Sequence, residues 1–225
     1  MCHRSSRKAP AQAAGGHVSK RDAETLTVQA VASIIRRVTL LFDNLPEGFL
    51  YRPEFITADE EAALLREIRA MDFSAVRMRG VTARRRVRQF GWRYGFDTWT
   101  LTEGEEVPEF LHPLRAKAAQ LVAVQPDDLS EALLTEYPAG AAIGWHRDAP
   151  MFGIVIGVSL LSSCVFKLRR GEAGRTDKPL SIEIAPRSVY VLDGEARRDW
   201  QHSIPAVRAA RYSITFRTVR RKKKA

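Results

Sequence analysis

The segment GIVIGVSLLSSCVFKL, residues 153–168, indicates a β-rich fold. It contains two short apolar runs rich in β-branched residues, separated by Ser162 and Ser163, and such runs are typical of strands. Similar runs, bounded by Gly, Pro or Asp, lie before and after it, which is the signature of an all-β sandwich or barrel. We therefore predict strands over residues 131–137, 153–161, 164–168, 180–184, 187–192 and 212–219.

Helices are predicted before these strands. Thr57-Ala58-Asp59-Glu60 has a capping-box pattern, and the apolar residues that follow form one face of a helix that ends near Met71. A second helix is expected from Pro113 to Ala123. Because the predicted helices precede a long series of predicted strands, we expect an α+β, mainly β fold. Its core would be a jelly roll, or double-stranded β-helix, buttressed by the N-terminal helices.

The length of 225 residues fits one large domain with extensions. We predict a variable, largely disordered extension over residues 1–40, a catalytic domain over 41–219 and a basic tail over 220–225. The net charge of +10 comes from both ends, because residues 41–217 hold 24 basic and 24 acidic side chains. A uniformly basic nucleic-acid-binding core is therefore excluded, although arginines gather before residue 94 and acids follow them.

Cys2 and Cys164 are the only cysteines, so the sequence offers no disulfide framework and favours an intracellular, cytoplasmic protein. No apolar stretch reaches the roughly 18 residues needed to span a bilayer. We expect a soluble monomer without membrane contact.

The segment GWHRDAP, residues 144–150, carries His146 and Asp148 two positions apart. In an alternating segment two such residues share a face and can chelate from one side. A histidine beside an aspartate is also commonly just a surface hydrogen-bonding pair. The motif alone leaves both interpretations open.

A third ligand would have to come from elsewhere in the chain. His3 and His17 lie in the N-terminal extension and His112 precedes a helix start, so His202 is the best candidate by elimination. Two imidazoles and one carboxylate are the facial-triad ligands of non-haem Fe(II) oxygenases, which leave positions open for a co-substrate and oxygen. Zinc is the rival ion, but a structural zinc site would want a fourth protein ligand, usually cysteine.

The segment RYSITFR begins nine residues after His202 and places Arg211 and Arg217 six positions apart. At the two-residue period of a strand both side chains point to one face, and two guanidinium forks suit a dicarboxylate. The alternatives are a solvated basic edge strand, or an Arg217 that pairs with a ligand carboxylate. Together with the metal ligands, the pattern indicates iron plus 2-oxoglutarate.

With these residues in place, the sequence resembles the AlkB family of Fe(II)- and 2-oxoglutarate-dependent dioxygenases from about Leu45 to Val219. The most specific stretches are YPAG at 137–140 leading to His146 and Asp148, GVSL at 157–160, DGEAR at 193–197 leading to WQH at 200–202, and RYSITFR at 211–217. The resemblance implies that His146, Asp148 and His202 bind Fe(II). It also implies that the co-substrate site contains Tyr137, Arg211, Arg217 and, where the family often has asparagines, Thr135 and Ser213.

The resemblance further implies oxidative demethylation of alkylated bases in DNA or RNA, with O₂ as oxidant and a single-stranded or flipped base as substrate. Residues 84–96 look like the family's substrate-covering lid, and their mixture of basic and aromatic side chains suits phosphates and stacked bases. Arg86, Phe90, Trp92 and Tyr94 are therefore expected to contact substrate. The competing interpretation of this segment is a solvated strand edge with Phe90, Trp92 and Phe96 in the core.

Pro150 is a departure from the family, because some repair members have an acidic residue there that contacts the base. Two alternatives to nucleic-acid demethylation stay open, and Pro150 and the neutral charge of residues 41–217 favour the first of them. One keeps the chemistry but changes the substrate to a protein side chain or a small molecule. The other is a non-catalytic nucleic-acid-binding module on the same fold.

Overall fold

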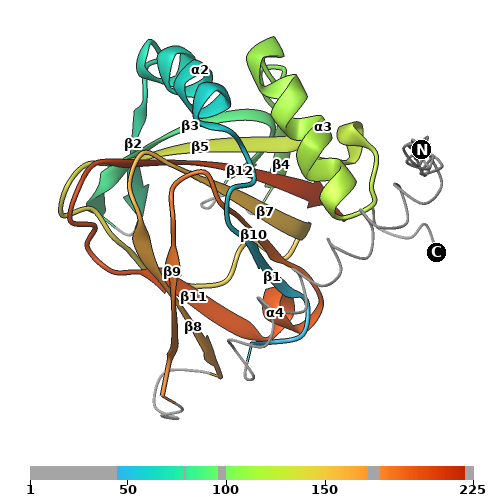
Figure 1. Ribbon diagram of the computed structural model, residues 1–225. Coiled ribbons are helices and arrows are strands. Elements are labelled where there is room, and N and C mark those ends of the chain that lie inside the picture. Colours follow the sequence, from blue (N-terminus) through green and yellow to red (C-terminus); the bar gives the residue numbers. More distant parts are fainter. Residues whose placement is uncertain (1–44, 79, 96–99, 172–177, 221–225) are drawn as a thin grey trace, which may run out of the picture. The chain divides into compact units, whose positions relative to one another are not determined.

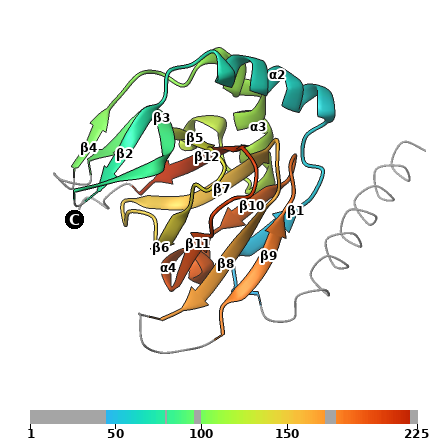
Figure 2. The same cartoon turned by 90° about the vertical axis from the view of Figure 1, so that its left-hand side faces the viewer.

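The computed structural model describes residues 45–78, 80–95, 100–171 and 178–220. Within them two antiparallel sheets face each other as a jelly roll (Figures 1 and 2), which confirms the predicted fold class. The strands are β1 (Phe49–Arg52), β2 (Ser74–Met78), β3 (Val81–Gly95), β4 (Thr100–Glu103), β5 (Glu131–Tyr137), β6 (Ile143–His146), β7 (Phe152–Leu160), β8 (Cys164–Arg170), β9 (Leu180–Ile184), β10 (Val189–Leu192), β11 (Trp200–Ile204) and β12 (Arg211–Val219). The larger sheet has the order β1-β10-β7-β12-β5-β3-β2, with β4 paired to β3, and the smaller sheet has the order β6-β11-β8-β9.

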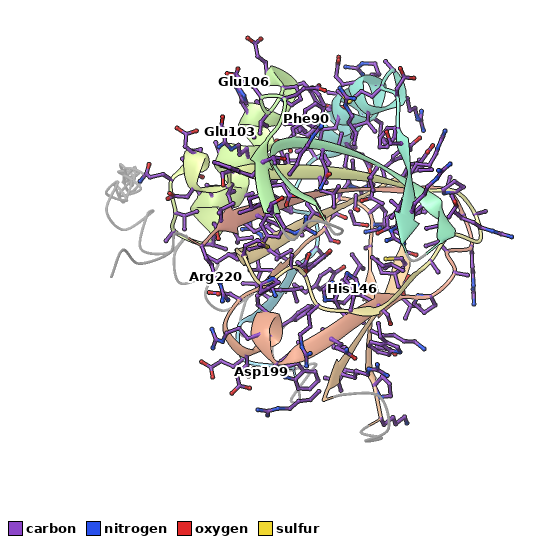
Figure 3. All side chains as sticks on the ribbon, turned by 180° about the vertical axis from the view of Figure 1, so that it is seen from behind. Phe90, Glu103, Glu106, His146, Asp199 and Arg220 are labelled. Carbon is purple, nitrogen blue, oxygen red and sulfur yellow. The ribbon has the colours of Figure 1, made fainter. Side chains whose placement is uncertain are left out.

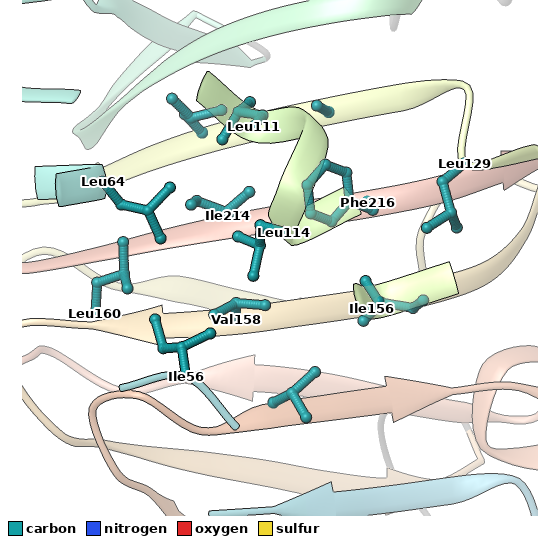
Figure 4. Close-up of a cluster of buried hydrophobic side chains, with 14 of the residues drawn as sticks. Ile56, Leu64, Leu111, Leu114, Leu129, Ile156, Val158, Leu160, Ile214 and Phe216 are labelled. Atoms are coloured by element: carbon teal, nitrogen blue, oxygen red, sulfur yellow. The ribbon is translucent and has the colours of Figure 1, made fainter. Parts of the chain in front are cut away.

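One face of the larger sheet packs against helices α2 (Ala58–Arg69) and α3 (His112–Leu121). Ile214 and Phe216 of the central strand β12 lie on this face, with Val158 and Leu134 as neighbours in register with Ile214. These side chains form a buried apolar cluster with residues of both helices (Figure 4). Because side chains alternate along a strand, the intervening residues of β12 point toward the smaller sheet.

The two helices confirm the predictions made from capping and periodicity. Thr57 caps α2 through a capping box with Glu60, in which each side chain accepts a hydrogen bond from the other's backbone N–H. Helix α3 begins one residue before the predicted Pro113 and ends at Leu121. Short helical segments η1 (Glu109–Leu111), η2 (Pro126–Asp128) and α4 (Gly194–Arg198) were not predicted.

The space between the two sheets contains a second buried cluster. Phe166 of β8 lies 4.8 Å, ring to ring, from Tyr190 of β10 and 6.3 Å from Phe49 of β1. Leu168 and Ile182 of the smaller sheet are also buried in this cluster. These contacts join the two sheets, and the polar inward-facing residues of β12 adjoin this cluster, since Arg211 lies against the ring of Tyr137.

The predicted strands at 131–137 and 180–184 match β5 and β9 residue for residue, and the other four agree to within two residues at each end. Strands β6 and β11, which carry the two candidate histidines, were not predicted as strands. The prediction for residues 1–40 and most of the basic tail lie outside the described residues. None of the described helices is both long and apolar enough to cross a membrane.

Candidate metal centre and co-substrate site

His146 and His202 lie directly opposite each other on neighbouring strands. They are register partners in the β6–β11 pair, and their ring centroids are 4.2 Å apart. His146 Nδ1 is 2.9 Å from the carbonyl oxygen of Gly144, so this nitrogen carries the proton and Nε2 is left with a free lone pair. Phe166 stacks on His202 at 5.4 Å with an interplanar angle of 14°, which fixes the second ring.

Asp148 completes the group from the connection between β6 and β7. Its side chain is only 5% exposed, and Oδ2 lies 3.5 Å from His202 Nε2. Oδ2 is buried without a hydrogen-bond partner, whereas Oδ1 accepts from Nε and Nη2 of Arg217. A buried carboxylate oxygen without a donor is costly unless a cation binds it, so this atom fits a metal ligand.

The protonation states also fit metal binding. Burial disfavours ionisation of Asp148, but the positive charges around it, with Arg217 the strongest and His202, His146 and Arg197 adding to it, together hold the pKa of the carboxyl well below its usual range. Burial lowers the pKa of His202 to about 3 and also lowers the pKa of His146. At neutral pH the group therefore offers one carboxylate and two neutral imidazoles, the forms that bind metal.

In the residues that the structure describes, no group of three or more His, Cys, Asp and Glu side chains is already placed to hold a metal ion. His202 contacts both of the other candidates: its ring lies against that of His146, and its Nε2 is 3.5 Å from Asp148 Oδ2. The donor set of two imidazoles and one carboxylate fits Fe(II).

Arg197 holds the backbone beside Asp148. It is buried in α4, and its Nη2 donates to the carbonyl oxygens of Asp148 (3.2 Å), Ala149 (2.7 Å) and Phe152 (3.0 Å). One guanidinium thus fixes the turn that carries the aspartate, while Arg217 fixes its side chain.

Arg211 is a buried cation in the face of the larger sheet that points toward the smaller one. It is 1% exposed, its Nε donates to Ser159 Oγ at 3.2 Å, and its guanidinium lies 4.9 Å from the centre of the Tyr137 ring. Nη1 is buried and has no hydrogen-bond partner. A buried guanidinium nitrogen without a partner is costly unless an anion binds it. A carboxylate suits this role, because its two oxygens can accept two parallel hydrogen bonds from the guanidinium.

The other predicted co-substrate residues surround this cation. Thr135 and Ser213 are buried register partners on β5 and β12, and Tyr137 is the partner of Arg211. Arg217 lies on the same face, as predicted. Its hydrogen bonds go to Asp148 and Glu131, so the structure bears out the alternative that Arg217 pairs with a candidate ligand carboxylate.

Several residues of this region were missed by sequence reasoning. Tyr190 on β10 faces the same space, and burial raises its pKa, so that its hydroxyl stays protonated. Burial also raises the pKa of Glu131, although the charge of Arg217 opposes the rise. The other missed residues are Arg85, Gln89, Ser159 and Arg197. Ser159 could have been predicted, because it lies in the GVSL stretch at 157–160 and side chains alternate between the two faces of a strand.

Gly157 is required where β7 passes Tyr190. A Cβ at this position would lie 2.2 Å from the Tyr190 ring, so we expect Gly157→Ala to lower the free energy of unfolding by about 1–3 kcal/mol. Urea denaturation measures this loss. Gly144→Ala is the matched control, because nothing lies within 4 Å of its Cβ, and it should stay within about 0.5 kcal/mol. Equal effects would show that the close approach has no energetic role.

The structure corrects the predicted substrate contacts on β3. Phe90 is 4% exposed and belongs to the helix-side cluster, so the prediction that it contacts substrate is wrong. Arg86 lies on the same face and pairs with Glu136. Trp92 lines a cavity of about 450 Å³ together with His112 and Arg115 of the helix side.

Figure 3 shows Phe90 well separated from His146. Arg86, Phe90 and Trp92 thus lie on the helix side of β3, and the odd-numbered Arg85 and Gln89 face the candidate centre. Tyr94 pairs with Leu101 through its backbone, and its side chain lies outside the described part of the structure.

Comparison with known proteins agrees with this geometry. The family model described as "2OG-Fe(II) oxygenase superfamily" matches residues 48–217. The "Alkylated DNA repair protein ALKBH8 homolog" of Arabidopsis thaliana is 27% identical over 189 residues, which cover 72% of this chain and 51% of that protein. The chain therefore spans about half the length of this relative.

Two solved structures share the fold. "The structure of OsALKBH1" superposes with a TM-score of 0.58 at 15% identity and covers 78% of this chain and all of that one. A prolyl hydroxylase from Trichoplax adhaerens, in complex with a hypoxia inducible factor peptide, gives a TM-score of 0.57 at 15% identity over 87% of this chain and 93% of that one. The chain belongs to the 2OG-Fe(II) oxygenase superfamily, whose members use Fe(II), 2-oxoglutarate and O₂, and it is similar to AlkB-type proteins.

Proposed function

We propose that this enzyme oxidatively demethylates alkylated bases in nucleic acid. His146, Asp148 and His202 bind Fe(II), and Arg211 binds the distal carboxylate of 2-oxoglutarate, with Tyr137, Thr135 and Ser213 around it. The observation that carries these assignments is a pair of unsatisfied buried atoms: Asp148 Oδ2 beside the histidines and Arg211 Nη1 on the adjoining sheet face.

The bound iron and co-substrate supply the oxidant: O₂ and 2-oxoglutarate give succinate and CO₂, and one oxygen atom enters a C–H bond of the substrate methyl group. The hydroxymethyl product then releases formaldehyde and the unmodified base. His146, Asp148 and His202 would hold the ion, Arg211 would anchor the dicarboxylate by charge, and the burial of these side chains would keep bulk water away. Burial of Arg211 and Asp148 strengthens both interactions.

A basic surface on the outer face of the smaller sheet supports nucleic acid as substrate. Because His146 and His202 point inward, their neighbours Trp145 and Gln201 point outward. Arg169 lies 4.3 Å from the Trp145 ring centre and donates to Gln201. None of Arg147, Lys167 and Arg169 forms an ion pair within the described residues, so their charges are available for phosphates.

The name of the Arabidopsis relative, an alkylated DNA repair protein, points to the same substrate class. A second candidate is the same oxidation of a protein side chain or small molecule. The ion pairs of β3 favour this candidate. Arg86 pairs with Glu136 and Arg88 with Glu105, so these two arginines offer little free positive charge for phosphates.

Formaldehyde release from methylated oligonucleotides tests the proposal. We expect the iron-loaded protein to release formaldehyde and succinate in equal amounts from at least one of four substrates, namely single- and double-stranded methylated DNA and RNA. Unmethylated oligonucleotides of the same sequence are the controls. Succinate formation without formaldehyde from any of the four would contradict nucleic-acid demethylation and favour the second candidate.

A further inference from the structure

Glu131 is a fully buried acid next to the candidate metal centre. It begins β5, is 0% exposed and lies on the inner face of the larger sheet, opposite Arg217 in register. Its Oε2 accepts from Arg217 Nη1 at 2.7 Å, and its Oε1 accepts from Gln89 Nε2 at 3.3 Å. Acidic residues are almost never buried this fully unless a partner requires them.

Arg217 is the link between Glu131 and the candidate centre. Its Nε and Nη2 both donate to Asp148 Oδ1, and its Nη1 donates to Glu131, so one planar guanidinium joins two carboxylates. The Phe152 ring lies 5.1 Å from the guanidinium carbon. Contacts on three sides leave the guanidinium little freedom to rotate, and its position decides which oxygen of Asp148 stays free.

The charges matter as much as the geometry. If Arg217 faced Asp148 alone, its positive charge would act wholly on that carboxylate and weaken it as a ligand for a cation. Glu131 shares the guanidinium and brings a second negative charge within the same buried network. With Glu131 ionised against Arg217, the three side chains together carry one net negative charge, which attracts a divalent ion in a medium of low dielectric.

We propose that Glu131 is a positioning residue of the iron centre: it holds Arg217 so that Asp148 presents Oδ2 alone to the metal, and it offsets the charge of Arg217. This inference rests on the proposed function of Asp148 as an iron ligand. Partners that orient metal ligands commonly change metal affinity by about 10–100-fold when they are replaced.

The test compares Fe(II) dissociation constants, measured by anaerobic competition with a chelator, in three variants. Glu131→Gln keeps the side-chain volume but removes the charge, and we expect affinity to fall by about 10–100-fold with 2-oxoglutarate binding to the residual iron complex retained. Glu131→Asp keeps the charge but shortens the reach, so an intermediate affinity is expected. Glu136→Gln is the control, because Glu136 lies on the same strand, pairs with Arg86 on the other face and should bind Fe(II) as the wild type does.

The melting temperature separates this role from a structural one. A lowered melting temperature in Glu131→Gln with a wild-type Fe(II) dissociation constant would overturn the inference and leave Glu131 as a structural ion pair. If Glu131→Gln does not fold, the Fe(II) dissociation constant of Glu131→Asp is the test. A wild-type value in Glu131→Asp would then also overturn the inference. Failure of the wild-type protein to bind Fe(II) would instead refute the proposed function itself.

Discussion

Replacing Asp148 with asparagine is expected to abolish Fe(II) binding and reduce turnover by at least about 10³-fold, since a catalytic metal supplies several kcal/mol of transition-state stabilisation. The amide oxygen can still accept the hydrogen bonds of Arg217, so the fold keeps its contact at Oδ1. The position of Oδ2 is then taken by an NH₂ group that cannot bind a cation. The measurements are iron content after anaerobic reconstitution and succinate formed from 2-oxoglutarate.

Asp127→Asn is the matched control, because Asp127 is 96% exposed and pairs with Arg115 away from the centre. It should bind iron and turn over as the wild type does. Iron content near one per chain in Asp148→Asn would remove Asp148 from the ligand set. Loss of iron in both variants would point to a general instability of the fold.

Replacing Arg211 with alanine is expected to weaken 2-oxoglutarate binding by at least about 30-fold, while Fe(II) binding stays at the wild-type level. Truncation of one partner of a buried, hydrogen-bonded charge pair costs about 2–5 kcal/mol. Arg211 meets that description because its Nη1 is buried and unpaired until an anion binds. Titration of the anaerobic Fe(II) complex with 2-oxoglutarate measures the loss.

Arg86→Ala is the control for this prediction. Arg86 is half exposed and pairs with Glu136 on the helix side of the larger sheet, so its removal should leave 2-oxoglutarate affinity unchanged. An unchanged affinity in Arg211→Ala would refute its assignment as the carboxylate anchor. The anchor would then have to be sought among the other donors of the inner face, such as Tyr190.

Much of the fold could be predicted because its strands carry strong local signals. Residues 131–137 and 180–184 are short segments that contain β-branched, aromatic or other apolar residues and have clear breaks at both ends, and they form β5 and β9 without a shift. Strand β6 is only four residues long and contains Gly144, which disfavours strands in isolation. Its pairing with β11 supplies the hydrogen bonds that its own sequence does not predict.

The candidate site was predictable where chemistry and spacing coincide. His146 and Asp148 lie two residues apart, and Arg211 and Arg217 share a face, as the strand period requires. Glu131 could not be found in this way, because an acid in a strand usually points to solvent. Its partner Arg217 lies 86 residues away, and only the pairing of β5 with β12 brings the two together.

The β3 prediction failed for a different reason. In the segment RRRVRQFGWRYGF, each of the two faces of the strand would carry both basic or polar and apolar side chains. The sequence therefore does not tell which face points to the site. Phe90 packs against the helices, and Arg86 and Arg88 lie on the same face because side chains two apart in a strand point the same way. Gln89 lies on the opposite face and donates to Glu131. Which face of β3 is buried depends on the packing of α3 against the sheet, and no local sequence pattern encodes that packing.

The metal and co-substrate assignments are tested together by an oxygen-free titration of the Fe(II)-loaded protein with 2-oxoglutarate, followed through the visible charge-transfer absorption of the iron–co-substrate complex. The wild type should saturate at one 2-oxoglutarate per chain, Arg211→Ala should require a higher concentration, and Asp148→Asn should give no absorption. A folded wild type without this absorption, or an Asp148→Asn variant that keeps it, would contradict the assignment of the centre.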